Sequence, residues 1–163
     1  MECACAAMGA YARVLSPQHE ERWRVAGLLH DFDYERHPTA QEHPFIGVAH
    51  LRTLDVDEEI IAAILGHASE RTGVHRFTPM AKALFAVDEL CGFIVACAKV
   101  RPQGLADLTA ANVIKKLQNR SFAAAVSRED VEQGSGELCQ LSDFDHAKHI
   151  DFCIQALREM PPA

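Results

Sequence analysis

The chain has 163 residues, a formal net charge of −7 and a hydrophobic share of 48%. That length suits one domain with a buried core, and the negative charge argues against a nucleic-acid polymer or an anionic membrane surface as the partner. A small molecule is the expected partner, and the oligomeric state stays open, a homodimer included. The six cysteines form no CxxC pair and no secretory signal is recognisable, so we expect reduced thiols and a cytoplasmic protein.

Two helices are predicted at the start of the chain. Residues 2–15 are rich in alanine and other small residues, which predicts a helix that packs closely against a neighbour and ends before Pro17. The next run, residues 18–31, has a stripe at helical spacing that consists of Trp23, Ala26, Gly27 and His30. His30 therefore continues a buried row, and Asp31 follows it at the end of the helix.

Histidines also lie on the stripes of the next two predicted helices. Pro38 interrupts the chain in a polar loop, and a third helix is expected to begin near residues 42–44. Its stripe, headed by a partly buried histidine, holds His43, Ile46, Gly47 and His50. A fourth helix over residues 57–68 begins with acidic residues and carries the stripe Ile60, Ile64 and His67.

The longest helix is predicted over residues 79–99, directly after the start signal Thr78-Pro79. Residues at spacings of three and four form its apolar face: Ala81, Leu84, Phe85, Asp88, Cys91, Gly92 and Val95. Asp88 is thus a carboxylate in the middle of an apolar face, where it needs a hydrogen-bonding partner or a metal ion.

The remaining segments are also predicted to be helical or irregular. Helices are expected around residues 110–119 and 143–160, whereas Gly134 and Gly136 argue against a continuous helix in the segment that follows Arg128. Six histidines are interpreted as surface residues: His19, His37, His50, His75, His146 and His149. Because the sequence has no alternating run of β-branched residues and no internal repeat, the predicted fold class is all-α.

Five polar residues are predicted to face inward from four helices: His30, Asp31, His43, His67 and Asp88. Imidazole and carboxylate groups together suit divalent cations such as Mn, Fe, Co, Ni, Zn or Mg. For the pair His30 and Asp31 alone, a capping aspartate and a hydrogen-bonded core histidine are the commoner explanation. The recurrence of the same anomaly along the chain favours a metal site.

Four stretches, in this order, carry a resemblance to a known family: GLLHDFDYE, HPFIG at residues 43–47, AAILGH ending at His67, and VDELCGFIVACAKVRP from Val87. In these stretches the chain resembles the HD-domain superfamily of metal-dependent phosphohydrolases, and most closely its small HDIG-type members that are described only as hydrolases. The resemblance implies an all-α HD-domain helical bundle, with residues 1–163 as a single HD domain.

The same resemblance implies a ligand set. His30, Asp31 and Asp88 match the HD pair and the final aspartate of the family, and two further residues, His43 and His67, match the extra histidines of members that hold two metals. Asp31 would then bridge the two ions, although one ion and two ions remain equally open.

One departure from the family pattern concerns its first ligand histidine, which would fall about one residue before Met1. The first helix is therefore expected to be shortened at its N-terminus. Three explanations stay open: Glu2, Cys3 or Cys5 substitutes for the missing ligand, the recorded start lies downstream of the true one, or the protein binds metal poorly.

The activity implied by the resemblance is hydrolysis of a small phosphate ester, such as a nucleotide, by a phosphomonoesterase or phosphodiesterase. The alternative is a catalytically weak HD protein that binds a nucleotide or a phosphorylated ligand as a sensor. Besides Asp31, Glu35 and Asp33 are candidate catalytic acids or bases, with solvated loop positions as the alternative for both. The candidate cations for the substrate phosphate, with a solvated surface as their alternative, are Arg101, Lys115 and Lys116.

Overall fold

The structure, a computed structural model, describes residues 1–161, and every regular element in that range is helical. Nine α-helices and one short 3₁₀ helix, η1, follow one another along the chain: α1 (Glu2–Leu15), η1 (Pro17–His19), α2 (Glu20–Leu29), α3 (Phe45–Thr53), α4 (Glu58–His67), α5 (Ser69–Thr72), α6 (Pro79–Lys99), α7 (Ala110–Leu117), α8 (Arg128–Cys139) and α9 (His146–Arg158). The all-α fold class is confirmed. No helix within residues 1–161 is both long enough and apolar enough to cross a membrane.

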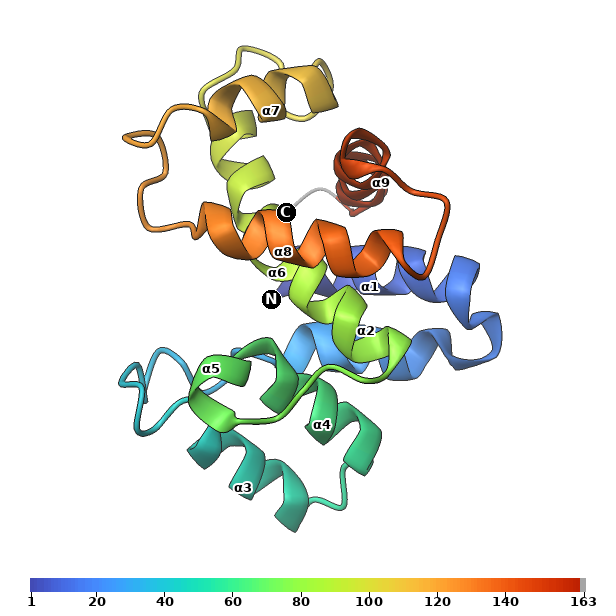
Figure 1. Cartoon of the computed structure of the whole chain (residues 1–163), viewed down its shortest axis with the longest axis vertical. Helices are drawn as coiled ribbons and strands as arrows, with labels where there is room; N and C mark the ends of the chain where they lie inside the picture. The colour runs from blue at the N-terminus through green and yellow to red at the C-terminus, as the bar shows by residue number, and fades with distance from the viewer. Residues whose placement is uncertain (162–163) are drawn as a thin grey trace.

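Helix α6 is the central element of the bundle (Figure 1). It begins where the sequence predicts, because the Thr78 side chain accepts a hydrogen bond from the backbone N–H of Ala81 and Pro79 occupies the first turn. Helices α1, α4 and α8 all pack against it. Large buried side chains of α6, such as Leu84, Leu90 and Phe93, anchor this packing.

Helices α1 and α2 lie against each other at close range, as the small residues of α1 predict. A Cβ atom added at Gly27 of α2 would lie 2.8 Å from the carbonyl oxygen of Ala4 on α1, so only glycine permits this approach. The predicted stripe of Trp23, Ala26, Gly27 and His30 is buried along its whole length. It therefore brings the end of α2 into the interior of the protein.

The expected break near Gly134 and Gly136 is wrong, because α8 is a continuous helix from Arg128 to Cys139. The tertiary contact explains the error: a Cβ atom at Gly134 would lie 2.7 Å from the Cα atom of Ala86 on α6. Gly134 is thus needed for the approach of two helices, and their packing outweighs its weak helix propensity.

Two other predictions of exposure need correction. His149, interpreted as a surface residue, is completely buried on α9. Of the stripe predicted before and along α3, His43 and Gly47 are buried but Ile46 is 41% exposed. His50 is exposed, as its interpretation as a surface residue predicts.

Candidate metal centre

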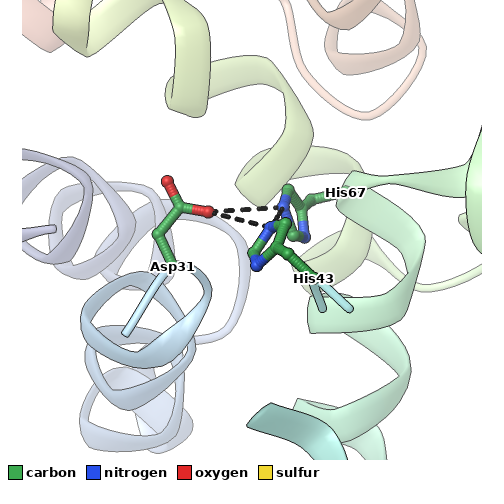
Figure 2. Close-up of side chains that lie close together, drawn as sticks. All are labelled: Asp31, His43 and His67. Carbon is green, nitrogen blue, oxygen red and sulfur yellow. Dashed lines mark hydrogen bonds and ion pairs between the residues drawn. The ribbon is translucent and has the colours of Figure 1, made fainter. Parts of the chain in front are cut away.

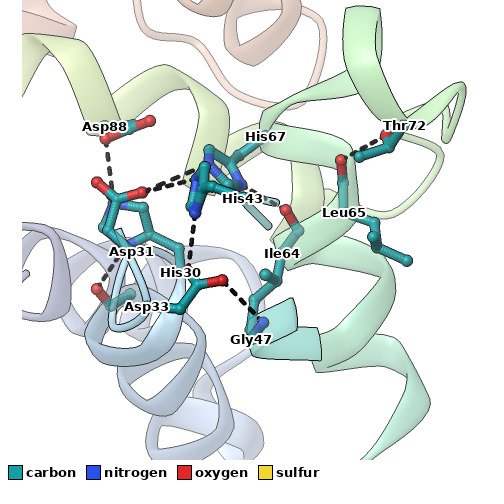
Figure 3. Close-up of polar contacts among 11 residues, drawn as sticks. His30, Asp31, Asp33, His43, Gly47, Ile64, Leu65, His67, Thr72 and Asp88 are labelled. Carbon is teal, nitrogen blue, oxygen red and sulfur yellow. Dashed lines mark hydrogen bonds and ion pairs between the residues drawn. The ribbon is translucent and has the colours of Figure 1, made fainter. Parts of the chain in front are cut away.

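His30 and Asp31 lie at the end of α2, whose last helical residue is Leu29. His30 is 3% exposed and its two ring nitrogens have different partners. Its Nδ1–H donates to the carbonyl oxygen of Gly27 at 2.9 Å, and its Nε2 lies 3.1 Å from Oδ1 of Asp88 on α6. The packing of α2 against the bundle therefore places the HD pair opposite Asp88, as Figure 3 shows.

His43 and His67 reach the same place from the opposite side (Figure 2). His43 precedes α3 and its Nδ1–H donates to Oδ1 of Asp33 at 2.8 Å, while His67 ends α4 and its Nδ1–H donates to the carbonyl oxygen of Ile64. The two Nε2 atoms face each other at 3.2 Å.

Asp31 lies between these two pairs of residues. Its Oδ1 is 3.2 Å from Nε2 of His43 and 3.6 Å from Nε2 of His67, while its Oδ2 is 3.5 Å from Nε2 of His30. Two sets of potential ligands share it, namely His30, Asp31 and Asp88, and Asp31, His43 and His67; within each set the ligand atoms lie within 4.8 Å of one another. The carboxylate of Asp31 is thus in position to bridge two cations.

The hydrogen bonds show that these residues fit divalent ions. The three histidines donate their Nδ1–H to groups that only accept, two carbonyl oxygens and a carboxylate. Each ring therefore presents the lone pair of Nε2 to the cluster when it is neutral, and an Nε2–H that can donate to the carboxylates when it is protonated. Two such lone pairs at 3.2 Å repel each other unless a proton or a metal ion lies near them. A histidine whose other nitrogen donates to a protein acceptor is the usual form of a metal ligand. Nitrogen and oxygen donors without thiolate suit borderline or hard divalent cations.

The electrostatics of the cluster also favour cations. Burial by itself would raise the pKa of Asp31, but hydrogen bonds from His43 and His67 outweigh burial and hold that pKa well below its usual range. Burial would likewise raise the pKa of Asp88, and the hydrogen bond from His30 lowers it instead. Both carboxylates therefore stay ionised, and the protein places negative charge where a cation can neutralise it.

The structure places Asp33 in the interior and Glu35 on the surface. Asp33 is 6% exposed; its Oδ1 accepts from His43 and its Oδ2 accepts from the backbone N–H of Gly47 at 2.8 Å. Glu35 is exposed, and neither residue lines the cavity. Asp33 orients His43 from behind, Glu35 is exposed, and a catalytic role for either residue stays a prediction.

A cavity of about 540 Å³ opens over the ligand cluster, a size in the usual range for small-molecule sites. The predicted phosphate-binding cations do not line it. Arg101 instead pairs with Asp107 at 2.6 Å, Lys116 lies over the ring of Phe122, and Lys115 is exposed. Their assignment to the substrate stays a prediction that the cavity does not support.

Sequence reasoning missed several residues of the cavity wall: Tyr34, Arg71, Arg76, Glu89, Asp130 and Gln133. Glu89 offered a signal, because it follows Asp88 directly. Its pKa is raised to about 7, mainly by burial and then by the negative charge of Asp88. Arg71 offered none, because it belongs to no motif and to no predicted apolar stripe. Cys3 lies on the wall, but it does not belong to either set of potential ligands in the described part of the chain.

Comparison with known proteins gave one match. The family model described as HD domain matches residues 3–92, which is more than half of the chain and includes all five residues of the ligand cluster. No curated protein and no solved structure matched the chain significantly.

Proposed function

Because the chain belongs to the HD domain family, we propose that it is a metal-dependent phosphohydrolase that cleaves a small phosphate ester, with a nucleotide as the leading candidate. One observation supports this proposal above the others: Asp31 is shared by two sets of potential ligands beneath an open cavity. Divalent ions bound there would supply Lewis-acid stabilisation of charge on the phosphoryl oxygens and would acidify water. Two ions are proposed, since His43 and His67 complete a second set.

The side chains around the cluster would keep this centre ready for metal. Gly27, Asp33 and Ile64 accept the Nδ1–H groups of the three histidines, so each ring is held with its Nε2 inward. This arrangement lowers the cost of orienting the ligands when metal binds.

The charges of the cavity wall favour a substrate with a single phosphate. Arg71 and Arg76 are its two arginines, and Arg76 is already paired with Glu137 at 2.6 Å. Arg71 is the wall arginine without an ion pair among residues 1–161. A second phosphate would instead meet carboxylates, among them Glu89 and Asp130. We therefore propose a monophosphate ester whose leaving group is polar and uncharged.

Metal analysis of the purified protein, followed by phosphate release from a panel of monoesters and diesters with Mn or Mg, tests the proposal. Asp31→Ala should lose both ions and Asp88→Ala at least one, and both variants should lose activity. Asp143→Ala, an exposed aspartate outside the cavity, is the matched control and should behave as wild type. Wild-type metal occupancy in a folded Asp31→Ala protein would contradict the metal centre. Ligand binding without phosphate release would contradict the hydrolase and favour the sensor.

A further inference from the structure

The C-terminal end of α4, which carries His67, has an unusual set of partners. The last carbonyl groups of a helix lack partners within the helix. Here the carbonyl oxygens of Ile64, Leu65 and Gly66 accept hydrogen bonds from side chains of residues that follow. The Nδ1–H of His67 donates to the carbonyl oxygen of Ile64, and the hydroxyl of Thr72 donates to that of Leu65 at 2.8 Å (Figure 3). The third carbonyl, that of Gly66, accepts from Nη1 of Arg76 at 2.9 Å.

Arg76 joins this helix end to two other parts of the bundle. Its Nη1 also donates to Oγ of Ser69 at 2.6 Å, and its guanidinium lies 3.7 Å from the centre of the Phe85 ring on α6. On α8, Glu137 accepts from Nε at 2.8 Å and from Nη2 at 2.6 Å. The Arg76 side chain is 6% exposed, so this pair is shielded from water, unlike an ordinary surface ion pair.

Arg76 also lines the cavity, which raises the question of a direct role in substrate binding. Its contacts argue against that role. Four hydrogen bonds to Gly66, Ser69 and Glu137 occupy most of the five N–H donors of a guanidinium, and the Glu137 carboxylate neutralises its charge. The guanidinium of Arg76 therefore holds neighbouring groups in place and has little capacity left to bind a substrate.

We propose that Arg76, oriented by Glu137, is a positioning residue for His67. The Nδ1–H of His67 can donate to Ile64 only while the last turn of α4 is intact, and Arg76 closes that turn at Gly66. Glu137 lies outside residues 3–92, the part that matches the HD domain family. Helix α8 thus determines the geometry of the site formed by Asp31, His43 and His67, and it acts on that site more strongly than on the site formed by His30, Asp31 and Asp88.

The first test is a cobalt titration of the full chain, followed by the absorption of the bound ion. Glu137→Gln and Arg76→Lys should weaken binding of the ion that contacts His67 about tenfold or more, which is the usual effect of removing a group that supports a metal ligand. The affinity for the ion that contacts His30 should change by less than threefold. Glu129→Gln is the matched control: the same substitution on the same helix, in an exposed pair with Arg120. Equal weakening of both ions would mean general destabilisation and would overturn the proposal, as would no change.

The second test needs no metal, so it separates this inference from the proposed function on which its cobalt arm rests. In the chelated wild-type protein, NMR of the imidazole nitrogens should show His67 with its proton on Nδ1. Glu137→Gln should shift His67 toward a mixture of both tautomers and leave His30 unchanged, since His30 is held by Gly27. An unaltered His67 signal in a folded Glu137→Gln protein would refute the positioning role, whatever the chain hydrolyses.

Discussion

Arg71 is a single residue whose role follows from its surroundings rather than from a motif. It lies at the end of α5, is exposed, and lines the cavity. The cations favoured by the sequence, in contrast, do not line the cavity, and Arg101 is paired with Asp107 instead. The position of a side chain relative to the cluster therefore decides which arginine can meet a phosphate.

Replacing Arg71 by alanine should lower kcat/KM for the phosphate ester by roughly ten- to a hundredfold, because a hydrogen bond to a charged group contributes about 1.5–3 kcal/mol. Most of the change should appear in KM. Arg101→Ala, the control, should leave both constants near the wild-type values. Steady-state kinetics with the best ester of the panel provides the measurement. Equal effects of Arg71→Ala and Arg101→Ala would contradict the assignment of Arg71 to the substrate phosphate.

His149 is a buried histidine whose neutral form the fold selects. Its Nδ1 accepts from the hydroxyl of Tyr11 at 2.6 Å, and its Nε2–H donates to the carbonyl oxygen of Ala86 at 3.0 Å. Burial lowers the pKa of His149 from 6.5 to about 4. Both nitrogens are satisfied in one tautomer, so protonation would cost the bond from Tyr11.

This pKa predicts how stability changes with pH. Between pH 6.5 and pH 4 the unfolded chain binds a proton at His149 that the folded chain does not bind, so the contribution of His149 to stability falls as the pH falls, by about 3 kcal/mol in total. The chelated wild-type protein and His149→Gln should be unfolded in urea from pH 7.5 to pH 4. The difference in the free energy of unfolding between wild type and His149→Gln should shrink or reverse toward pH 4. Because the two proteins share all other titrating groups, the contributions of those groups cancel in the difference. A difference independent of pH would contradict the assignment.

At the scale of elements, the contact of α6 with α8 is the feature that sequence patterns misjudged. Gly134 and Gly136 are both helical in α8, but only Gly134 faces a neighbouring backbone. Tertiary packing therefore requires glycine at position 134 but not at position 136. The same contact aligns α8 so that Glu137 reaches Arg76.

Gly134→Ala should therefore lower the free energy of unfolding by about 1–3 kcal/mol, the usual cost of overpacking, because the new methyl group meets backbone atoms that have little room to move. Gly136→Ala meets open space and should raise that free energy by up to about 1 kcal/mol through helix propensity. Urea unfolding of the two variants checks the pair. Similar values for both would mean that the helices can separate without cost.

At the scale of the whole molecule, the ligand cluster joins segments that lie far apart in the sequence. The end of α2, the residue before Pro44 and α3, the end of α4 and the middle of α6 supply two sets of potential ligands that share Asp31, so ions in both sets would together hold all four segments. The unfolded chain cannot hold these ligands together. Metal binding would therefore be coupled to the stability of the entire fold.

Adding Mn at about one hundred times its dissociation constant should raise the free energy of unfolding by about 2.7 kcal/mol for a single ion. The same addition should leave Asp31→Ala nearly unchanged, since it removes the carboxylate shared by both sets of potential ligands. Thermal unfolding with and without chelator measures the effect, and Asp143→Ala serves again as the control. Equal stabilisation of Asp31→Ala would place the ion elsewhere on the molecule.

The sequence by itself determined most of the helices and named the five polar residues that the fold brings together. Helix periodicity and caps are local, so Thr78-Pro79 marked the start of α6 correctly, and the buried stripe that ends at His30 could be read from spacing alone. Polar residues on such stripes indicated a metal site because burial of unpaired charge is costly.

The tertiary structure decided what each residue meets, since partners come from segments distant in the chain. Only the packing shows that Asp33 supports His43, that Arg71 rather than Arg101 lines the cavity, and that His149 is enclosed by α1 and α6. Charged residues are buried only where a partner meets them, and small residues are common both in the core and on the surface. Their place depends on which backbone or side chain the fold brings beside them, and this is a property of the whole bundle rather than of any local pattern.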